Sequence, residues 1–141
     1  MHWLKLARFL WAAPCTAIGG VLALIPLALG GSATWSRGAL EVTYRQDRAG
    51  CGRRARALRF RGIVFGHVIL AVTAEELVRI GPHERVHVDQ YERWGLLFFP
   101  AYGLSSAWQL LRGRNPYWHN HFEIQARERS AASCDQRHRA C

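Results

Sequence analysis

The chain lacks any cysteine arrangement typical of a disulfide framework or a zinc knuckle. Cys15 falls inside an apolar run, and the remaining cysteines, Cys51, Cys134 and Cys141, form an odd set without a Cys-x-x-Cys pair. Irregular spacing and an odd number indicate neither kind of cross-link. The cysteines therefore give no reason to expect a stapled or cysteine-ligated domain.

Acidic residues are few, and lysine is almost absent. The chain has 19 basic against 10 acidic side chains, a formal net charge of +9, and its single lysine is Lys5. Many arginines lie in 45–61, directly after a long apolar run, where each charge near an anionic membrane contributes on the order of 1 kcal/mol of attraction. No nucleic-acid-binding motif accompanies them. The basic charge is thus predicted to meet lipid headgroups, and no nucleic acid partner is expected.

Charge is missing altogether from Phe9 to Gly31. This stretch is long enough to cross a bilayer as a helix, and it predicts an uncleaved single-pass anchor in a membrane. The alternative is a cleaved signal peptide, since Lys5 and Arg8 form a basic start and small residues follow at 31–33. The apolar run is longer than in most signal peptides, which favours the anchor. Basic residues flank the run on both sides, so they do not define its orientation.

The segments after the apolar run show the alternation of β-strands. Residues 38–45 alternate apolar and polar side chains, and 46–55 have the glycine and arginine content of a turn region. Residues 58–72 begin with strict alternation and continue as a β-branched run interrupted by Gly62 and Gly66, which predicts one bent strand or a hairpin. We expect a small antiparallel sheet.

Helix signals begin at Thr73, which with Glu76 makes a capping box. A short helix is predicted to end at Gly81, because glycine is the usual residue after a helix C-terminus. A second helix is predicted to begin with Pro82 at its first position and to run to Gly95.

Two further helices follow. Residues 96–111 are apolar but short for a span, so we expect a buried or membrane-facing helix that starts near Pro100. Another helix should begin near Asn120, and the small, polar residues at the C-terminus predict a loose tail. The expected division of this α+β chain is a membrane anchor, a domain with a small antiparallel sheet and about three helices, and a tail, over residues 1–34, 35–129 and 130–141.

The sequence HERVH at residues 83–87 is the strongest functional signal in the chain. On a helix, positions four apart share a face with Cβ atoms about 5–6 Å apart, so His83 and His87 can converge on one Zn²⁺ ion. Glu84 projects about 100° away and can reach water beside the ion, as the general base of a zinc hydrolase does. The alternative is a pair of core histidines bonded to backbone carbonyls, and the spacing favours metal.

A catalytic zinc usually takes three protein ligands. Gln90 and Arg93 exclude the extended motif with a third histidine, so a later glutamate is needed. Glu92 is predicted on the solvent side of the same helix, and Glu128 lies between arginines. Glu123 is favoured, because it stands near a helix start among apolar residues, although a charge there could also serve the helix N-terminus alone.

The motif resembles that of gluzincin metallopeptidases, whose smallest members combine a short sheet with three helices. More closely, "HERVHVDQYERWGLLFFPAYGLSSAW" followed by "GRNPYWHNHFEIQA" is similar to a family of short bacterial membrane proteins with the pattern H-E-x-x-H-x-x-Q-Y-E-x-x-G, P-x-Y, N-P-F-E-x-x-A. The resemblance covers about 66–126. His121 replaces the proline of that pattern, so His119 or His121 could compete with Glu123 for the ion. Tyr117, His119 and His121 are the candidates for an oxyanion donor.

Together these features predict a membrane-anchored zinc hydrolase, most simply a metallopeptidase with Glu84 as general base and a peptide or protein substrate held along the strand 63–70. His67 in that strand is expected to be structural. Two alternatives stay open. The same residues could hold a structural or sensory metal, or the chain could be an accessory subunit that docks through 96–111 on a membrane partner without any metal.

Overall fold

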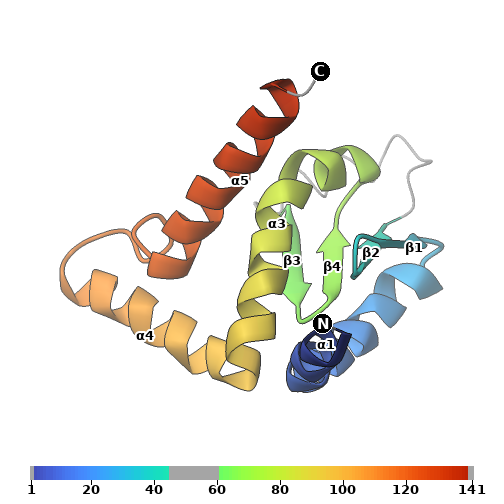
Figure 1. Ribbon diagram of the computed structural model, residues 1–141, viewed down its shortest axis with the longest axis horizontal. Coiled ribbons are helices and arrows are strands. Elements are labelled where there is room, and N and C mark those ends of the chain that lie inside the picture. Colours follow the sequence, from blue (N-terminus) through green and yellow to red (C-terminus); the bar gives the residue numbers. More distant parts are fainter. Residues whose placement is uncertain (1, 45–60, 140–141) are drawn as a thin grey trace.

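The computed structural model describes residues 2–44 and 61–139, which form an α+β fold (Figure 1). In chain order the elements are α1 (His2–Ala28), β1 (Ser32–Ser36), β2 (Ala39–Thr43), β3 (Gly62–Phe65), β4 (Val68–Ala71), α3 (Ala74–Trp94), a 3₁₀ turn η1 (Gly95–Leu97), α4 (Phe98–Leu111) and α5 (His121–Arg139). The turn region predicted at 46–55 and the first residues of the strand predicted at 58–72 lie outside the described residues.

The sheet is mixed, so the prediction of a purely antiparallel sheet was wrong. Its order is β1-β2-β4-β3, with antiparallel outer pairs and a parallel pair of β2 with β4 at the centre. Both hairpins turn at residues with positive φ, namely Arg37 with Gly38 in one and Gly66 in the other. The two central strands bury Val42 and Val68 in one cluster with Ala23 of α1. Packing on the same helix therefore places the second strands of the hairpins side by side.

Helix α1 packs against the sheet through a stripe of small residues. Ala12, Cys15, Gly19 and Ala23 are buried on the face that meets the sheet and α3. Gly19 allows a close approach to β3, since a Cβ there would lie 2.8 Å from the carbonyl oxygen of Phe65. By length and composition, the helix from Trp3 to Ala28 could also cross a membrane. One apolar helix thus has two faces, of which one belongs to the protein core.

Helix α3 is continuous, and the predicted break at Gly81 was wrong. Thr73 caps its start as expected, accepting a hydrogen bond from the backbone N–H of Glu76 at 3.1 Å. Pro82 lies inside the helix, where it removes one backbone hydrogen bond. Tertiary contacts keep the first turns in line, because Leu77 packs against the core and Ile80 lies over Gly62 of β3.

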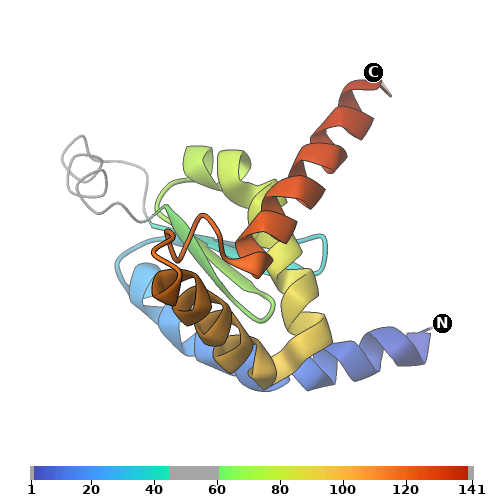
Figure 2. The same cartoon turned by 90° about the vertical axis from the view of Figure 1, so that its left-hand side faces the viewer.

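The last two helices begin and end differently from the prediction. Helix α4 starts at Phe98 after η1, so Pro100 occupies the third helical position, where a backbone N–H has no partner within the helix. Helix α5 runs through most of the predicted loose tail, as far as Arg139. Its alanines, arginines and glutamines favour helix even without burial. Figures 1 and 2 show the first turn of α5 beside α4 and its C-terminal end at the opposite end of the molecule from α1 and α4.

Candidate metal centre

Three predicted side chains converge between α3 and α5. His83 and His87 stand one turn apart on α3, and Glu123 comes from the first turn of α5. The two Nε2 atoms are 3.1 Å apart, and they lie 3.3 Å and 3.4 Å from the Oε2 and Oε1 atoms of Glu123. One ligand atom from each residue lies within 4.8 Å of the others, the geometry of a group that could hold a metal ion. The structure thus brings Glu123, the favoured third ligand, to the two histidines.

The donor set fits zinc. Zinc bonds to imidazole nitrogen and carboxylate oxygen are about 2.0–2.1 Å long, which puts tetrahedral ligand atoms about 3.3 Å apart, close to the three separations observed here. Two imidazole Nε2 atoms that face each other also need a proton or a cation between them. Glu123 adds a second unmet requirement, since its buried Oε2 makes no hydrogen bond to the described residues. A cation at this point would satisfy all three side chains.

Gln90 orients the deeper histidine, a role that the sequence analysis missed. Its side chain is fully buried, and its Oε1 lies 2.8 Å from Nδ1 of His87. An Nδ1–H that donates to this oxygen leaves the Nε2 lone pair of His87 free for a metal. The Gln90 amide also donates to the backbone oxygen of Phe122 and to Gln125, which joins α3 to α5. The sequence signal was present, because Gln90 follows His87 by three residues and belongs to the quoted family pattern, but the pattern alone gave it no role.

Two further residues position Glu123. Tyr102 of α4 donates a hydrogen bond of 2.9 Å to Oε1 of Glu123. Asn120 is fully buried and caps α5, accepting from the N–H of Phe122, while its amide donates to the carbonyl of Tyr102 and to Ser106. The start of α5 and the inner face of α4 are therefore fixed to one another beside the glutamate.

Glu84 lies next to the group but is not part of it. Its side chain is buried, and burial raises the pKa of its carboxyl group, although His87 and His83 act to lower it. No described residue donates a hydrogen bond to this carboxylate, so it is available to accept a proton.

The charges of the group depend on one another. Burial alone would raise the pKa of Glu123, but its close contacts with His83 and His87 outweigh burial and hold that pKa well below the usual range. Burial would lower the pKa of His87, yet the neighbouring Glu123 raises it overall. Glu123 and His87 thus each favour the charged form of the other, and a metal cation could take the place of the proton between them.

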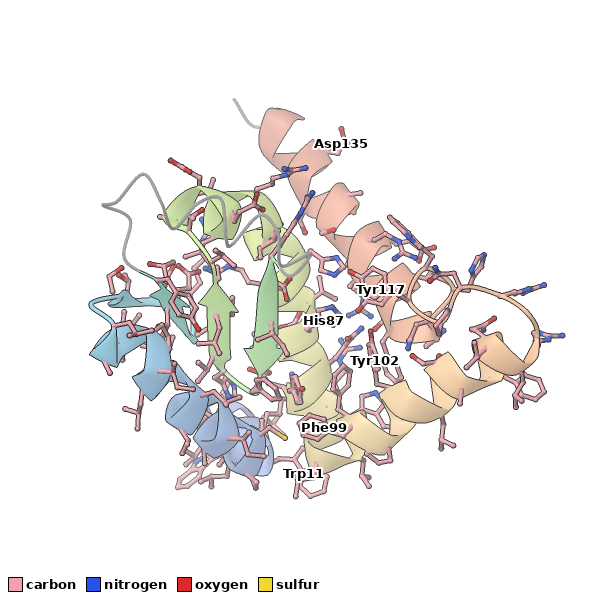
Figure 3. The ribbon with its side chains drawn as sticks, turned by 180° about the vertical axis from the view of Figure 1, so that it is seen from behind. Trp11, His87, Phe99, Tyr102, Tyr117 and Asp135 are labelled. Carbon is pink, nitrogen blue, oxygen red and sulfur yellow. The ribbon has the colours of Figure 1, made fainter. Side chains whose placement is uncertain are left out.

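The predicted oxyanion donors are not equally placed. Tyr117 lies beside the group, where burial and then the charge of Glu123 raise its pKa to about 12, so its hydroxyl stays protonated. Figure 3 shows Tyr117 together with Tyr102 and His87 in the angle between α3, α4 and α5. His119 and His121 are exposed, and the structure does not bring them into the group; the ring of His119 approaches the carbonyl of Asn115 instead.

The other glutamates differ in their environments. Glu128 is exposed, as expected. Glu92 was predicted on the solvent side, but it is half-buried and lies 3.3 Å from Nε2 of His67. The buried His67 also contacts the Thr16 hydroxyl through Nδ1 at 3.0 Å and stacks on Phe9. His67 therefore links α1 to α3 and has the structural role that was predicted for it.

Access to the group comes from the side of His83. Its side chain is 21% exposed, against 10% for His87 and 5% for Glu123. A cavity of about 380 Å³ lies elsewhere, lined by Arg37, Arg85, Asp89 and neighbouring residues, and it includes none of the three. The converging side chains of His83, His87 and Glu123 therefore lie outside this cavity.

No protein-family model matches this chain, and comparisons with curated proteins and with solved structures find no match either. The resemblance to gluzincins therefore remains a prediction from the motif residues.

Proposed function

We propose that this protein is a membrane-bound zinc-dependent hydrolase that cleaves peptide bonds. The observation that carries the proposal is the convergence of His83, His87 and Glu123, with the buried carboxylate of Glu84 beside them. Zinc bound by these three side chains would supply a Lewis acid that activates water near neutral pH.

The chain's own residues account for the proton transfers of hydrolysis. Glu84 would take a proton from the attacking water and then deliver it to the leaving amine. Its raised pKa suits this role, because a base that must also act as an acid works best near the operating pH. The neutral Tyr117 hydroxyl can donate to oxygen that gains negative charge. A peptide could pair along β3, which is an edge strand of the described sheet.

The site supports catalysis better than a structural metal. A structural zinc site is closed by four protein ligands. Among the described residues the group has three ligands, and the partial exposure of His83 leaves an approach for substrate.

Membrane attachment through α1 belongs to the same proposal. The helix is long and apolar enough for a membrane span, and its exposed bulky apolar side chains would hold the chain in a bilayer. A signal peptidase cut near Thr34 would remove Ala23 from its buried cluster with Val42 of β2 and Val68 of β4. It would also remove the Thr16 hydroxyl that contacts His67. These contacts favour a helix that stays with the mature protein.

Two variants test the proposal, because the two glutamates have different roles. Glu84→Gln should keep about one zinc per chain and lose hydrolysis of a peptide library. Glu123→Gln should lose zinc itself, since a neutral amide is a weak ligand. Elemental analysis of the detergent-purified full chain provides the first measurement. Absence of zinc even after reconstitution would end the metal proposal, and an active Glu84→Gln protein would refute the mechanism alone.

A further inference from the structure

Helix α4 turns its polar side chains and the core residue Phe98 toward the protein, while most of its bulky apolar side chains face outward. Tyr102 and Ser106 form hydrogen bonds to α5 and to the loop before it. On the outer face Leu104 is 72% and Leu111 is 83% exposed. A surface helix in water has the opposite arrangement, with its apolar stripe toward the core. The outer face of α4 therefore fits an apolar environment.

Helix α1 also directs its bulky apolar side chains away from the protein. Its small residues pack against the sheet, while bulky apolar side chains such as Leu10, Val21, Leu24 and Ile25 are more than half exposed. The polar face of an ordinary interfacial helix is replaced here by contact with the protein. Two helices from distant parts of the chain thus expose apolar surface.

These two faces are continuous through the turn between α3 and α4. Trp11 of α1 lies against Gly95, where an added Cβ would be 2.6 Å from the indole nitrogen, and the next residues, Leu96 and Leu97, are exposed. Figures 1 and 2 place α1, α4 and this turn at one end and the C-terminal end of α5 at the other, and Figure 3 shows Trp11 and Phe99 opposite Asp135. We call the outer faces of α1 and α4 with residues 95–97 the apolar base.

Cationic side chains flank the apolar base. Lys5 and Arg8 are exposed near the start of α1, Arg93 precedes the turn, and Arg112 follows α4. The Arg112 guanidinium lies over the ring of Trp108, 5.3 Å from its centroid. Cations and tryptophans around an apolar surface match the interface of a bilayer with anionic headgroups.

We infer that the apolar base rests in one leaflet of an anionic membrane, with α1 lying along the surface and α4 beside it as a second contact. The sheet and its hairpin turn touch α1 from Thr16 to Ala23, so a crossing α1 would carry the sheet and its Glu41–Arg85 ion pair to the depth of the hydrocarbon. Burial of such charges and strand edges in lipid is costly. The metal centre, on the inner face of α4, then lies within about one helix diameter of the headgroups. This inference does not depend on the proposed metal or hydrolysis.

The contact of α4 can be tested with fluorescent probes on the full chain. Leu104→Cys and the matched control Val78→Cys, which is 80% exposed on α3, are placed in a chain with Cys51, Cys134 and Cys141 replaced by serine; Cys15 is fully buried and stays. On vesicles of phosphatidylcholine and phosphatidylglycerol, brominated lipid should quench the Leu104 probe several-fold more than the Val78 probe. Leu111→Cys repeats the test if Leu104→Cys does not fold. If brominated lipid quenches the α4 probe no more than the Val78 probe on vesicles that have bound the chain, the inference is overturned, whether water, a second copy or another protein covers that face.

The course of α1 is tested separately. The cysteine positions are Trp3→Cys at the start of α1 and Trp35→Cys in β1, beyond the other end of the helix, and both residues are exposed. Each variant, in the same cysteine background, is treated with an impermeant thiol reagent. Right-side-out and inside-out membrane vesicles from the expressing bacterium supply the two sides. Both cysteines should react in the same preparation. Reaction of each in a different preparation would show that α1 crosses the membrane and would refute the arrangement.

Discussion

Replacement of Gln90 by leucine should weaken zinc binding and loosen the contact between α3 and α5 at the same time. Gln90 makes three buried side-chain hydrogen bonds, to His87, to the backbone of Phe122 and to Gln125. At about 1 kcal/mol net for each bond, their loss should lower the free energy of unfolding of the metal-free protein by about 3 kcal/mol. Leucine has a similar volume, so little of this loss should come from a cavity.

The effect on zinc has a separate origin. Without the oxygen of Gln90, His87 loses the acceptor that fixes its tautomer and ring orientation. Removal of such an outer partner commonly costs 10- to 100-fold in metal affinity, which is the change expected for Gln90→Leu. Competition with a chromophoric chelator measures the affinity, and urea unfolding in the presence of excess chelator measures the stability.

Gln125→Ala is the matched control for this prediction. It removes one of the three hydrogen bonds and leaves the contact of Gln90 with His87 intact. It should lower stability by about 1 kcal/mol and leave zinc affinity unchanged. If Gln90→Leu binds zinc as tightly as the parent, Gln90 does not orient His87. Equal weakening in both variants would instead assign the effect to the packing of α3 on α5.

Tyr102→Phe should weaken zinc affinity roughly tenfold, because Glu123 loses a donor at 2.9 Å, and unchanged affinity in the chelator competition would contradict this. Gly19→Ala should destabilise the protein by about 1–3 kcal/mol, because the added Cβ would lie 2.8 Å from a β3 carbonyl oxygen. The control Gly20→Ala meets nothing within 4 Å and should leave stability unchanged. Equal melting temperatures of the two variants would disprove this difference. In chelator, the stability advantage of the parent over Glu123→Gln should shrink as pH falls below about 4. Burial would raise the pKa of Glu123, but its contacts with His83 and His87 lower it, so the folded state favours the charged carboxylate. If urea unfolding shows the same stability difference between the two proteins down to pH 3, this reasoning is wrong.

The chain's order in space was partly readable from local patterns. The alternation in 38–45 predicted a strand, and 58–72 predicted one bent strand or a hairpin; the structure has β2 in the first and the β3–β4 hairpin in the described part of the second. The cap at Thr73 was also predicted correctly. These features depend on neighbours a few residues apart, which the sequence displays directly.

Other features depended on contacts between distant segments. The helix continues through Pro82 because Leu77 and Ile80 pack on the core and on β3, which outweighs the local tendency to break. Likewise β2 and β4 become parallel neighbours through their shared contact with α1. No periodicity in the sequence encodes such a choice, since each hairpin alone is compatible with several neighbours.

The candidate metal centre likewise depends partly on local sequence and partly on contacts between distant segments. The sequence by itself determined that His83 and His87 share one face of a helix and that Glu84 does not, because helical geometry fixes these directions. Only the tertiary structure decided that Glu123 meets them, since Glu123 comes 36 residues after His87 and α5 must pack on α3, where Gln90 holds it. The outward apolar face of α4 was likewise decided by packing, because the polar face of the helix was needed to position Glu123.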